Sequence, residues 1–196
     1  MKKVAYRFFW LWLVLLLAGC HPAPHWYGQD ITGLMPNLQF QLRGVDGQPV
    51  TAANVDGKAV MLFFGYTSCP DVCPATLSRL AQAKAALPAE LQQQLMILFV
   101  SVDPGRDTPA KLKQYTDFFG DGIRGLTGSK QELDEITSRY RTSYSYGPVD
   151  AKGNYVVSHG SGIYGFDRHG KIHLLVMGDD LPLSQLTADM KQLVEL

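Results

Sequence analysis

Residues 59–74 have the sequence AVMLFFGYTSCPDVCP, and this stretch decides the fold. Its first part, Ala59–Tyr66, is a short apolar run, which is typical of a strand buried on both faces of a sheet. A second apolar run, Leu95–Val102, follows a segment from Asp71 to Leu87 that we expect to be helical. A strand, a helix and a strand in this order are typical of an α/β sheet.

Weaker patterns extend this unit along the chain. Leu38, Phe40 and Leu42 alternate with polar residues and predict a half-buried strand, after which Asp46-Gly47 predicts a hairpin turn. Further on we expect a helix from Pro109 capped by Thr108 and a helix from Lys130 with a Ser129/Glu132 capping box. An extended segment over 155–157 and a strand–turn–strand over 162–177 should follow. A final helix should have Leu183, Leu186, Met190, Leu193 and Val194 on one face.

The order of these elements predicts a thioredoxin-like α/β fold, with a central mixed sheet flanked by helices and an N-terminal hairpin extension. Met61 and Met177 lie in apolar strands and are expected in the core. His169 and His173 lie in the C-terminal hairpin and are expected in solvent, as are His21 and His25 near the N-terminus.

The first residues form a predicted export signal. Basic residues up to Arg7 precede the apolar run Phe8–Leu17, and small residues lead into Cys20. This is the pattern of a bacterial lipoprotein, in which residues 1–19 are the signal peptide and Cys20 is lipidated. An uncleaved transmembrane anchor is the alternative, although the apolar stretch is short against the roughly 20 residues that a spanning helix needs. Either interpretation anchors the domain in the bacterial cell envelope, on the extracytoplasmic, periplasmic side.

Composition limits the domain organisation and the class of partner. The chain has 196 residues, with 18 Lys and Arg against 18 Asp and Glu, so no excess of basic charge points to nucleic acid. We expect a tether over residues 20–36, rich in Pro, Gly and polar residues, and one domain over 37–196. Lipidation of Cys20 would leave Cys69 and Cys73 as a pair, in a compartment where disulfides form.

Cys69 and Cys73 follow the first buried strand and lie at the beginning of the predicted helix. Helical geometry places them about one turn apart on the same face, so they can form a disulfide or bind one soft metal ion. The helix N-terminus favours their thiolate forms. Three interpretations stay open: a structural disulfide, which would close only a tiny loop; a structural zinc site, which lacks further ligands; and a functional pair for thiol exchange, copper or both.

His159 bears on the choice between thiol exchange and copper. Thiol–disulfide oxidoreductases of this fold usually have two residues between their cysteines and a cis-proline before the strand that faces the site. Here three residues intervene, and the chain has no proline between Pro148 and Pro182. The loop with His159 occupies the place of that proline, and two thiolates with one imidazole suit both Cu(I) and Cu(II). The alternative is that His159 is a solvated loop residue.

Four motifs surround these residues: Phe64–Thr67 with Cys69-Pro-Asp-Val-Cys73-Pro74, Ser101–Pro104 continuing through Arg106–Pro109, Tyr155–His159, and Gly165–Asp167 with Gly170. With them, the chain resembles the Sco/SenC family of copper-binding, thioredoxin-like proteins over nearly all of the mature domain. The resemblance implies that Cys69, Cys73 and His159 bind one copper ion. It also implies delivery of copper to, or thiol reduction at, the dinuclear copper site of cytochrome c oxidase.

The sequence therefore predicts a copper metallochaperone rather than an enzyme. Its expected partner is the oxidase subunit that carries the dinuclear copper site, or another extracytoplasmic copper or thiol protein. The alternative is a thiol–disulfide reductase, in which Cys69 and Cys73 are the redox pair and form a disulfide when oxidised. A copper or redox sensor is a third interpretation, which no feature of the sequence favours. We expect the Asp103–Pro109 motif to form a turn and a helix start at the cysteine end of the sheet.

Overall fold

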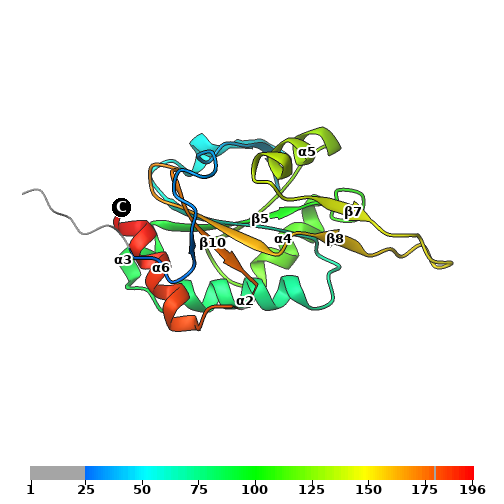
Figure 1. Ribbon diagram of the computed structural model, residues 1–196. Coiled ribbons are helices and arrows are strands. Elements are labelled where there is room, and N and C mark those ends of the chain that lie inside the picture. Colours follow the sequence, from blue (N-terminus) through cyan, green and yellow to red (C-terminus); the bar gives the residue numbers. More distant parts are fainter. Residues whose placement is uncertain (1–24, 179) are drawn as a thin grey trace, which may run out of the picture.

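The computed structural model describes residues 25–178 and 180–196 (Figure 1). Its helices are α2 (Val72–Ala85), α3 (Ala89–Gln92), α4 (Pro109–Asp117), α5 (Lys130–Arg139) and α6 (Leu183–Glu195), with a 3₁₀ helix η1 (Ala52–Val55). Its strands are β1 (Gln29–Asp30), β2 (Gln41–Gly44), β3 (Pro49–Thr51), β4 (Ala59–Gly65), β5 (Leu95–Ser101), β6 (Ile123–Thr127), β7 (Tyr144–Tyr146), β8 (Val157–His159), β9 (Gly162–Phe166) and β10 (Ile172–Met177).

The main sheet is mixed and has eight strands in the order β1-β10-β9-β4-β5-β6-β2-β3. β4, β5 and β6 are parallel, whereas β9 pairs with β4 in the antiparallel sense. Figure 1 shows α2 and α6 against one face of the sheet and α5 on the opposite face. The thioredoxin-like arrangement is confirmed, and the N-terminal hairpin β2–β3 extends the sheet beside β6.

The central strands are buried because both faces of the sheet are covered. Every residue of β4 is buried, and β5 pairs with it in register from Ala59 opposite Leu95 to Gly65 opposite Ser101. Parallel neighbours end at the same edge of a sheet. The loop that follows Gly65 and the loop that follows Ser101 therefore start side by side, as the sequence predicted.

Both predicted helix starts are confirmed. The Thr108 side chain accepts a hydrogen bond from the amide of Lys111, with Pro109 at the first helical position of α4. Ser129 and Glu132 form the predicted capping box of α5. These caps satisfy amides that have no partner within the helix, and they fix the residue at which each helix begins.

The segment before β2 differs from the prediction. The tether expected over 20–36 is wrong from Trp26 onward, because Trp26 and Ile31 are buried in the core. β1 pairs with β10, and the amides of Tyr27 and Gly28 each donate to the Asp189 carboxylate of α6 at 2.9 Å. The folded unit therefore includes Trp26, and the segment from Trp26 to Ile31 forms a strap across β10 and α6.

Two further expectations were wrong. His173 is buried rather than solvated: its Nε2 lies 2.8 Å from Asp167 Oδ2, and its Nδ1 lies 3.1 Å from Thr32 Oγ1. The Trp26 ring packs against it, with centroids 5.5 Å apart. Met177, in contrast, is 44% exposed at the end of β10, whereas Met61 is in the core as predicted.

The predicted export signal and Cys20 lie outside the described residues. Among residues 25–178 and 180–196, no helix has the length and apolar character required to cross a membrane.

Asp189→Ala tests the attachment of the strap. The substitution leaves two amides without their acceptor, and we expect the free energy of unfolding of the full chain in detergent to fall by about 1–3 kcal/mol. The measurement is urea denaturation, with limited proteolysis reporting cleavage near residues 25–31. Lys191→Ala is the control, because it removes an exposed residue of the same helix and should change stability by less than about 0.5 kcal/mol. Equal stability of the two variants would contradict the role of Asp189.

Candidate metal centre

Cys69 and Cys73 lie where the chain passes from β4 into α2. The amide of Cys69 donates to the Tyr66 carbonyl, which closes a turn, and Asp71 is the N-cap of the helix. Cys73 and Pro74 then lie in its first turn, where the missing amide of a proline costs little. The amide of Cys73 lies 3.4 Å from Cys69 Sγ, so the predicted one-turn spacing is confirmed and both sulfurs face the same site.

A glycine makes room for the inner sulfur. A Cβ atom at Gly65 would lie 2.7 Å from Cys73 Sγ and 2.7 Å from Cε2 of Phe99, closer than real Cβ contacts. Only glycine therefore fits at the end of β4 beneath Cys73. Cys73 is fully buried as a result, whereas Cys69 is partly exposed, and both are free thiols.

His159 reaches the cysteines from the β7–β8 hairpin. Its Nε2 lies 3.4 Å from Cys73 Sγ, and its Nδ1 lies 3.0 Å from the Gly160 carbonyl oxygen. Because a carbonyl only accepts hydrogen bonds, Nδ1 carries a proton, and in the neutral ring Nε2 presents its lone pair to the cysteines. The rings of Phe63 and Tyr66 each pack against the imidazole in a T-shaped arrangement and restrict its orientation.

The ligand atoms of Cys69, Cys73 and His159 all lie within 4.8 Å of one another. Within the part of the chain that the structure describes, this is the one group of three or more His, Cys, Asp and Glu residues that converges in this way. The structure thus brings together all three predicted site residues. His25, His169 and His173 are not part of this group.

The protonation of the buried thiol differs from expectation. Burial raises the pKa of Cys73 far above its ordinary value, and the neighbouring Cys69 raises it further. The sequence analysis expected the helix N-terminus to favour the thiolate, whereas burial favours the neutral thiol. In the metal-free protein Cys73 is therefore a thiol at neutral pH, and binding a metal ion must release its proton.

The Asp103–Pro109 loop forms the predicted turn and also holds the cysteine loop. Asp107 is buried, and its carboxylate accepts hydrogen bonds from the Thr67 amide (2.8 Å), the Thr67 hydroxyl (2.5 Å) and the Ser101 hydroxyl (2.6 Å). The sequence analysis did not predict this link. The sequence did hold one signal for it: Asp107 is an acidic residue shortly after β5, and β5 ends beside β4, from which the cysteine loop starts.

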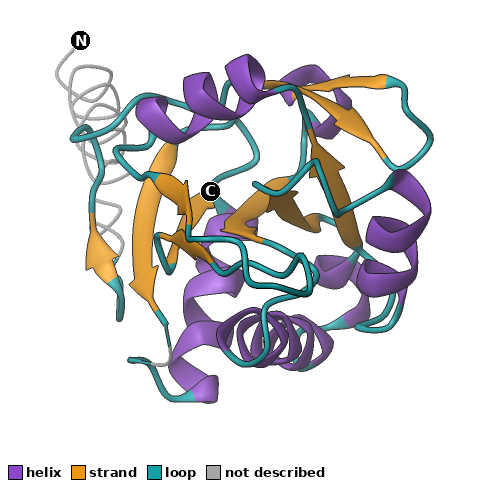
Figure 2. Cartoon of the chain, turned by 90° about the vertical axis from the view of Figure 1, so that its right-hand side faces the viewer, coloured by secondary structure: helices purple, strands orange, loops and turns teal. Residues whose placement is uncertain are grey.

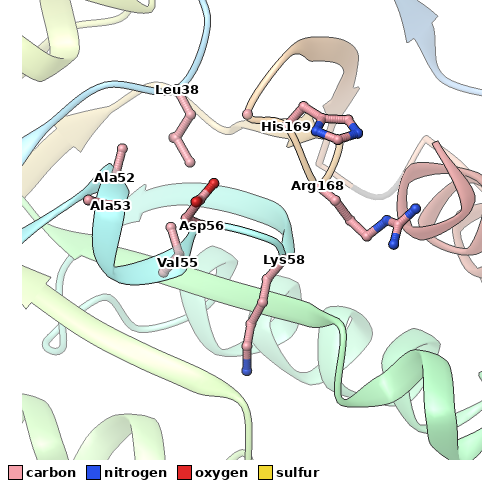
Figure 3. Close-up of a pocket in the computed structure, with 9 residues that line it drawn as sticks. Leu38, Ala52, Ala53, Val55, Asp56, Lys58, Arg168 and His169 are labelled. Atoms are coloured by element: carbon pink, nitrogen blue, oxygen red, sulfur yellow. The ribbon is translucent and has the colours of Figure 1, made fainter.

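A pocket lies at the opposite end of β4 from the cysteines, between η1 and the β9–β10 turn (Figure 3). Leu38, Ala52, Ala53 and Val55 line one side of it. Figure 3 shows the charged ends of Lys58 and Arg168 turned away from its centre. The pocket therefore presents no converging ligand atoms, and we assign it no role.

The fold and the site together define a class of protein. It is a thioredoxin-like domain in which a histidine faces a dithiol with three intervening residues, which makes a compact set of soft metal ligands. A profile of the SCO1/SenC family matches residues 33–195, and the chain belongs to this family.

Individual relatives agree with this assignment. The mouse mitochondrial SCO2 homolog is 39% identical over 126 residues, which cover 64% of this chain and 49% of the mouse protein. The chain therefore spans about half the length of that relative. The copper-bound structure of ScoI from Bradyrhizobium japonicum is 33% identical, with a TM-score of 0.72 over 81% of this chain and 99% of that one. The apo Sco1 structure from Thermus thermophilus is 32% identical, with a TM-score of 0.78 over 89% of this chain and 100% of that one.

Gly65→Ala tests the packing beneath Cys73. The added methyl group meets Cys73 Sγ and the Phe99 ring, so we expect a loss of about 1–3 kcal/mol in the free energy of unfolding and faster alkylation of Cys73. Denaturation in urea and mass spectrometry after timed alkylation measure the two effects. Gly105→Ala is the control, because its nearest contact, the Tyr155 hydroxyl at 3.6 Å, is an ordinary one. Equal alkylation rates in both variants would contradict this account.

Proposed function

We propose that this protein is a copper metallochaperone, which binds one copper ion through Cys69, Cys73 and His159. It would thereby support assembly of the dinuclear copper site of cytochrome c oxidase. The observation that carries the proposal is the convergence of two sulfurs and one imidazole nitrogen within 4.8 Å. Membership of the SCO1/SenC family and the similarity to a copper-bound ScoI support the choice of metal and partner.

The donor set suits copper and differs from that of structural zinc. Structural zinc is almost always bound by four ligands, whereas three ligand atoms meet here among the described residues. Thiolates are ligands of Cu(I), and imidazole serves both oxidation states, so one site can hold Cu(I) and Cu(II). The buried thiol also fits a cargo ion, because binding of a metal ion would replace the proton that burial holds on Cys73.

The exposure of the ligands indicates how copper would enter and leave. Cys73 is fully buried, while Cys69 and His159 are partly exposed. A ligand of the partner protein would therefore approach from the side of Cys69 and His159. Because a three-coordinate ion has room for one more donor, the partner can bind it before this protein releases it. Copper would then move by ligand exchange rather than through free solution.

A thiol–disulfide reductase is the second candidate. The observation that favours it is the partly exposed Cys69 beside a buried thiol, which is the arrangement of an attacking and a resolving cysteine. Cys69 would attack a partner disulfide, and Cys73 would then displace the reduced partner and leave a Cys69–Cys73 disulfide. This reaction transfers two electrons to the partner and removes two copper ligands from this protein. Copper loading and redox state would therefore be coupled.

The proposal places the domain in the bacterial cell envelope, on the periplasmic side, held to the membrane by lipid on Cys20 after removal of residues 1–19. The sequence around Cys20 supports this part. A Cys20→Ser chain expressed in bacteria should keep its signal peptide, so mass spectrometry should find residues 1–19 still attached. Wild-type protein should begin at a diacylated Cys20. An unmodified Cys20 in an uncleaved wild-type chain would favour the transmembrane alternative.

Anaerobic copper titration of the reduced full chain in detergent tests the metallochaperone proposal. We expect one copper ion per chain, and His159→Ala should lower copper affinity by at least roughly tenfold, the lower end of the effects seen when a metal site is altered. His169→Ala is the matched control, because His169 lies outside the ligand group. Equal affinity of His159→Ala and wild type would reject the proposed site.

The reductase alternative makes a different prediction. Metal-free protein should reduce a partner disulfide, and this activity should survive His159→Ala but be lost in Cys69→Ser. The same preparations serve for both assays, so each variant reports on both candidate functions.

A further inference from the structure

The hairpin that carries His159 is not part of the main sheet. Among the described residues, β7 and β8 pair only with each other, as a two-stranded sheet. Figure 1 shows the hairpin projecting from the body of the molecule, and Figure 2 views the molecule from that side. A two-stranded hairpin by itself is marginally stable in water. The position of His159 over the cysteines therefore depends on contacts between this hairpin and the rest of the domain.

Arg106 makes the most extensive of these contacts. Its guanidinium carbon lies 3.6 Å from the centroid of the Tyr155 ring, and its Nη1 donates to the Tyr155 carbonyl at 2.8 Å. On its other side, Nε donates to Asp103 Oδ2 at 2.5 Å. The Tyr155 hydroxyl donates to the second oxygen of the same carboxylate at 2.7 Å. Arg106, Asp103 and Tyr155 thus form a closed ring of contacts, which we call the clamp.

The clamp joins the hairpin to a rigid part of the domain. Asp103 is 1% exposed and follows directly from the end of β5, so it offers a fixed acceptor. Tyr146 adds a contact from the opposite strand, where its hydroxyl donates to the Val102 carbonyl at 2.7 Å. From Tyr155 the chain reaches His159 within four residues, along β8. We therefore expect a displacement at Tyr155 to move the imidazole.

The same loop also orders the cysteines. Asp107 lies one residue beyond Arg106 and binds both the amide and the hydroxyl of Thr67, in the segment that leads to Cys69. One short loop consequently holds the two halves of the site, the dithiol through Asp107 and the histidine through Arg106. The guanidinium carbon also lies 5.6 Å from the centroid of the Tyr66 ring, which packs against His159 in a T-shaped arrangement.

We propose that Arg106 is a positioning residue, which uses the clamp to hold His159 over Cys69 and Cys73 and so sets the affinity of the site for copper. The inference rests on the proposed function for the identity of the ion. Lysine cannot replace arginine in this role, because it lacks the planar group that stacks on Tyr155 while donating in two directions. Ordering of His159 before the ion arrives removes an entropy cost from binding.

Copper affinity of the full chain in detergent, titrated anaerobically with copper alone, tests the proposal. Arg106→Ala should weaken binding by about 10–100-fold, the range for loss of a residue that orients a metal ligand. Lys152→Ala is the matched control, because it removes one positive charge from the exposed tip of the same hairpin and should bind as wild type does. Arg106→Lys should resemble Arg106→Ala, whereas Tyr155→Phe, which keeps the ring, should lose less. Wild-type affinity in Arg106→Lys would overturn the clamp.

A double-mutant cycle separates positioning from general destabilisation. If Arg106 acts through His159, Arg106→Ala should cost nothing further in a His159→Ala background. An equal loss of affinity in both backgrounds would overturn the proposal. The Cu(II) electron paramagnetic resonance spectrum gives a second readout: wild type should show nitrogen coupling from His159, Arg106→Ala should lose this coupling, and Lys152→Ala should keep it.

Hydrogen exchange of the metal-free chain tests the clamp independently of copper. Amides of the β7–β8 hairpin should exchange at least about tenfold faster in Arg106→Ala than in Lys152→Ala, the effect expected when one charge-assisted hydrogen bond is lost. Unchanged exchange would overturn the clamp even if wild type binds copper. Faster exchange in a protein that binds no copper would instead reject the proposed function and retain the clamp.

Discussion

Parallel pairing of β4 with β5 is the constraint on which the rest of the site depends. Because Gly65 lies opposite Ser101, the loops that follow these two residues leave the sheet at the same edge. The cysteine loop and the Asp103–Pro109 loop are therefore neighbours, and the buried Asp107 carboxylate joins them through Thr67 and Ser101. Burial of a carboxylate without these donors would cost free energy. The register of β4 and β5 therefore also provides the hydrogen bonds that allow Asp107 to be buried.

The parts of the fold that local sequence determines could be predicted. An unbroken apolar run is enough to identify β4, and Ser129 with Glu132 is enough to place the start of α5. The relative position of Cys69 and Cys73 could also be predicted from local sequence, because one helical turn separates the two residues and places them on the same face. His159 is different: it lies 86 residues from Cys73, so no local spacing relates the two residues. The order of the strands, the absence of a proline in its loop and the family resemblance pointed to it.

The errors arose where a residue's surroundings come from distant parts of the chain. Residues 25–36 look like a polar linker, because Trp26 and Ile31 are isolated apolar residues without periodicity. They are buried because β10 and α6, more than 140 residues away, provide the complementary surface. His173 was misjudged for the same reason, since the Trp26 ring and the Thr32 hydroxyl that cover it belong to that strap.

The docked strap has a geometrical consequence for a protein held by lipid. With Cys20 lipidated as proposed, residues 20–25 are all that separate the bilayer surface from the folded unit, and even fully extended they reach only about 20 Å. Figure 1 shows the described chain starting beside α3 and the C-terminus, whereas the β7–β8 hairpin projects from the other end. Such a short linker would keep the domain within a shallow layer above the bilayer. A partner would have to present its copper-accepting groups within that layer. The height of each protein's copper site above the bilayer would then help to determine which partners can exchange copper with this protein.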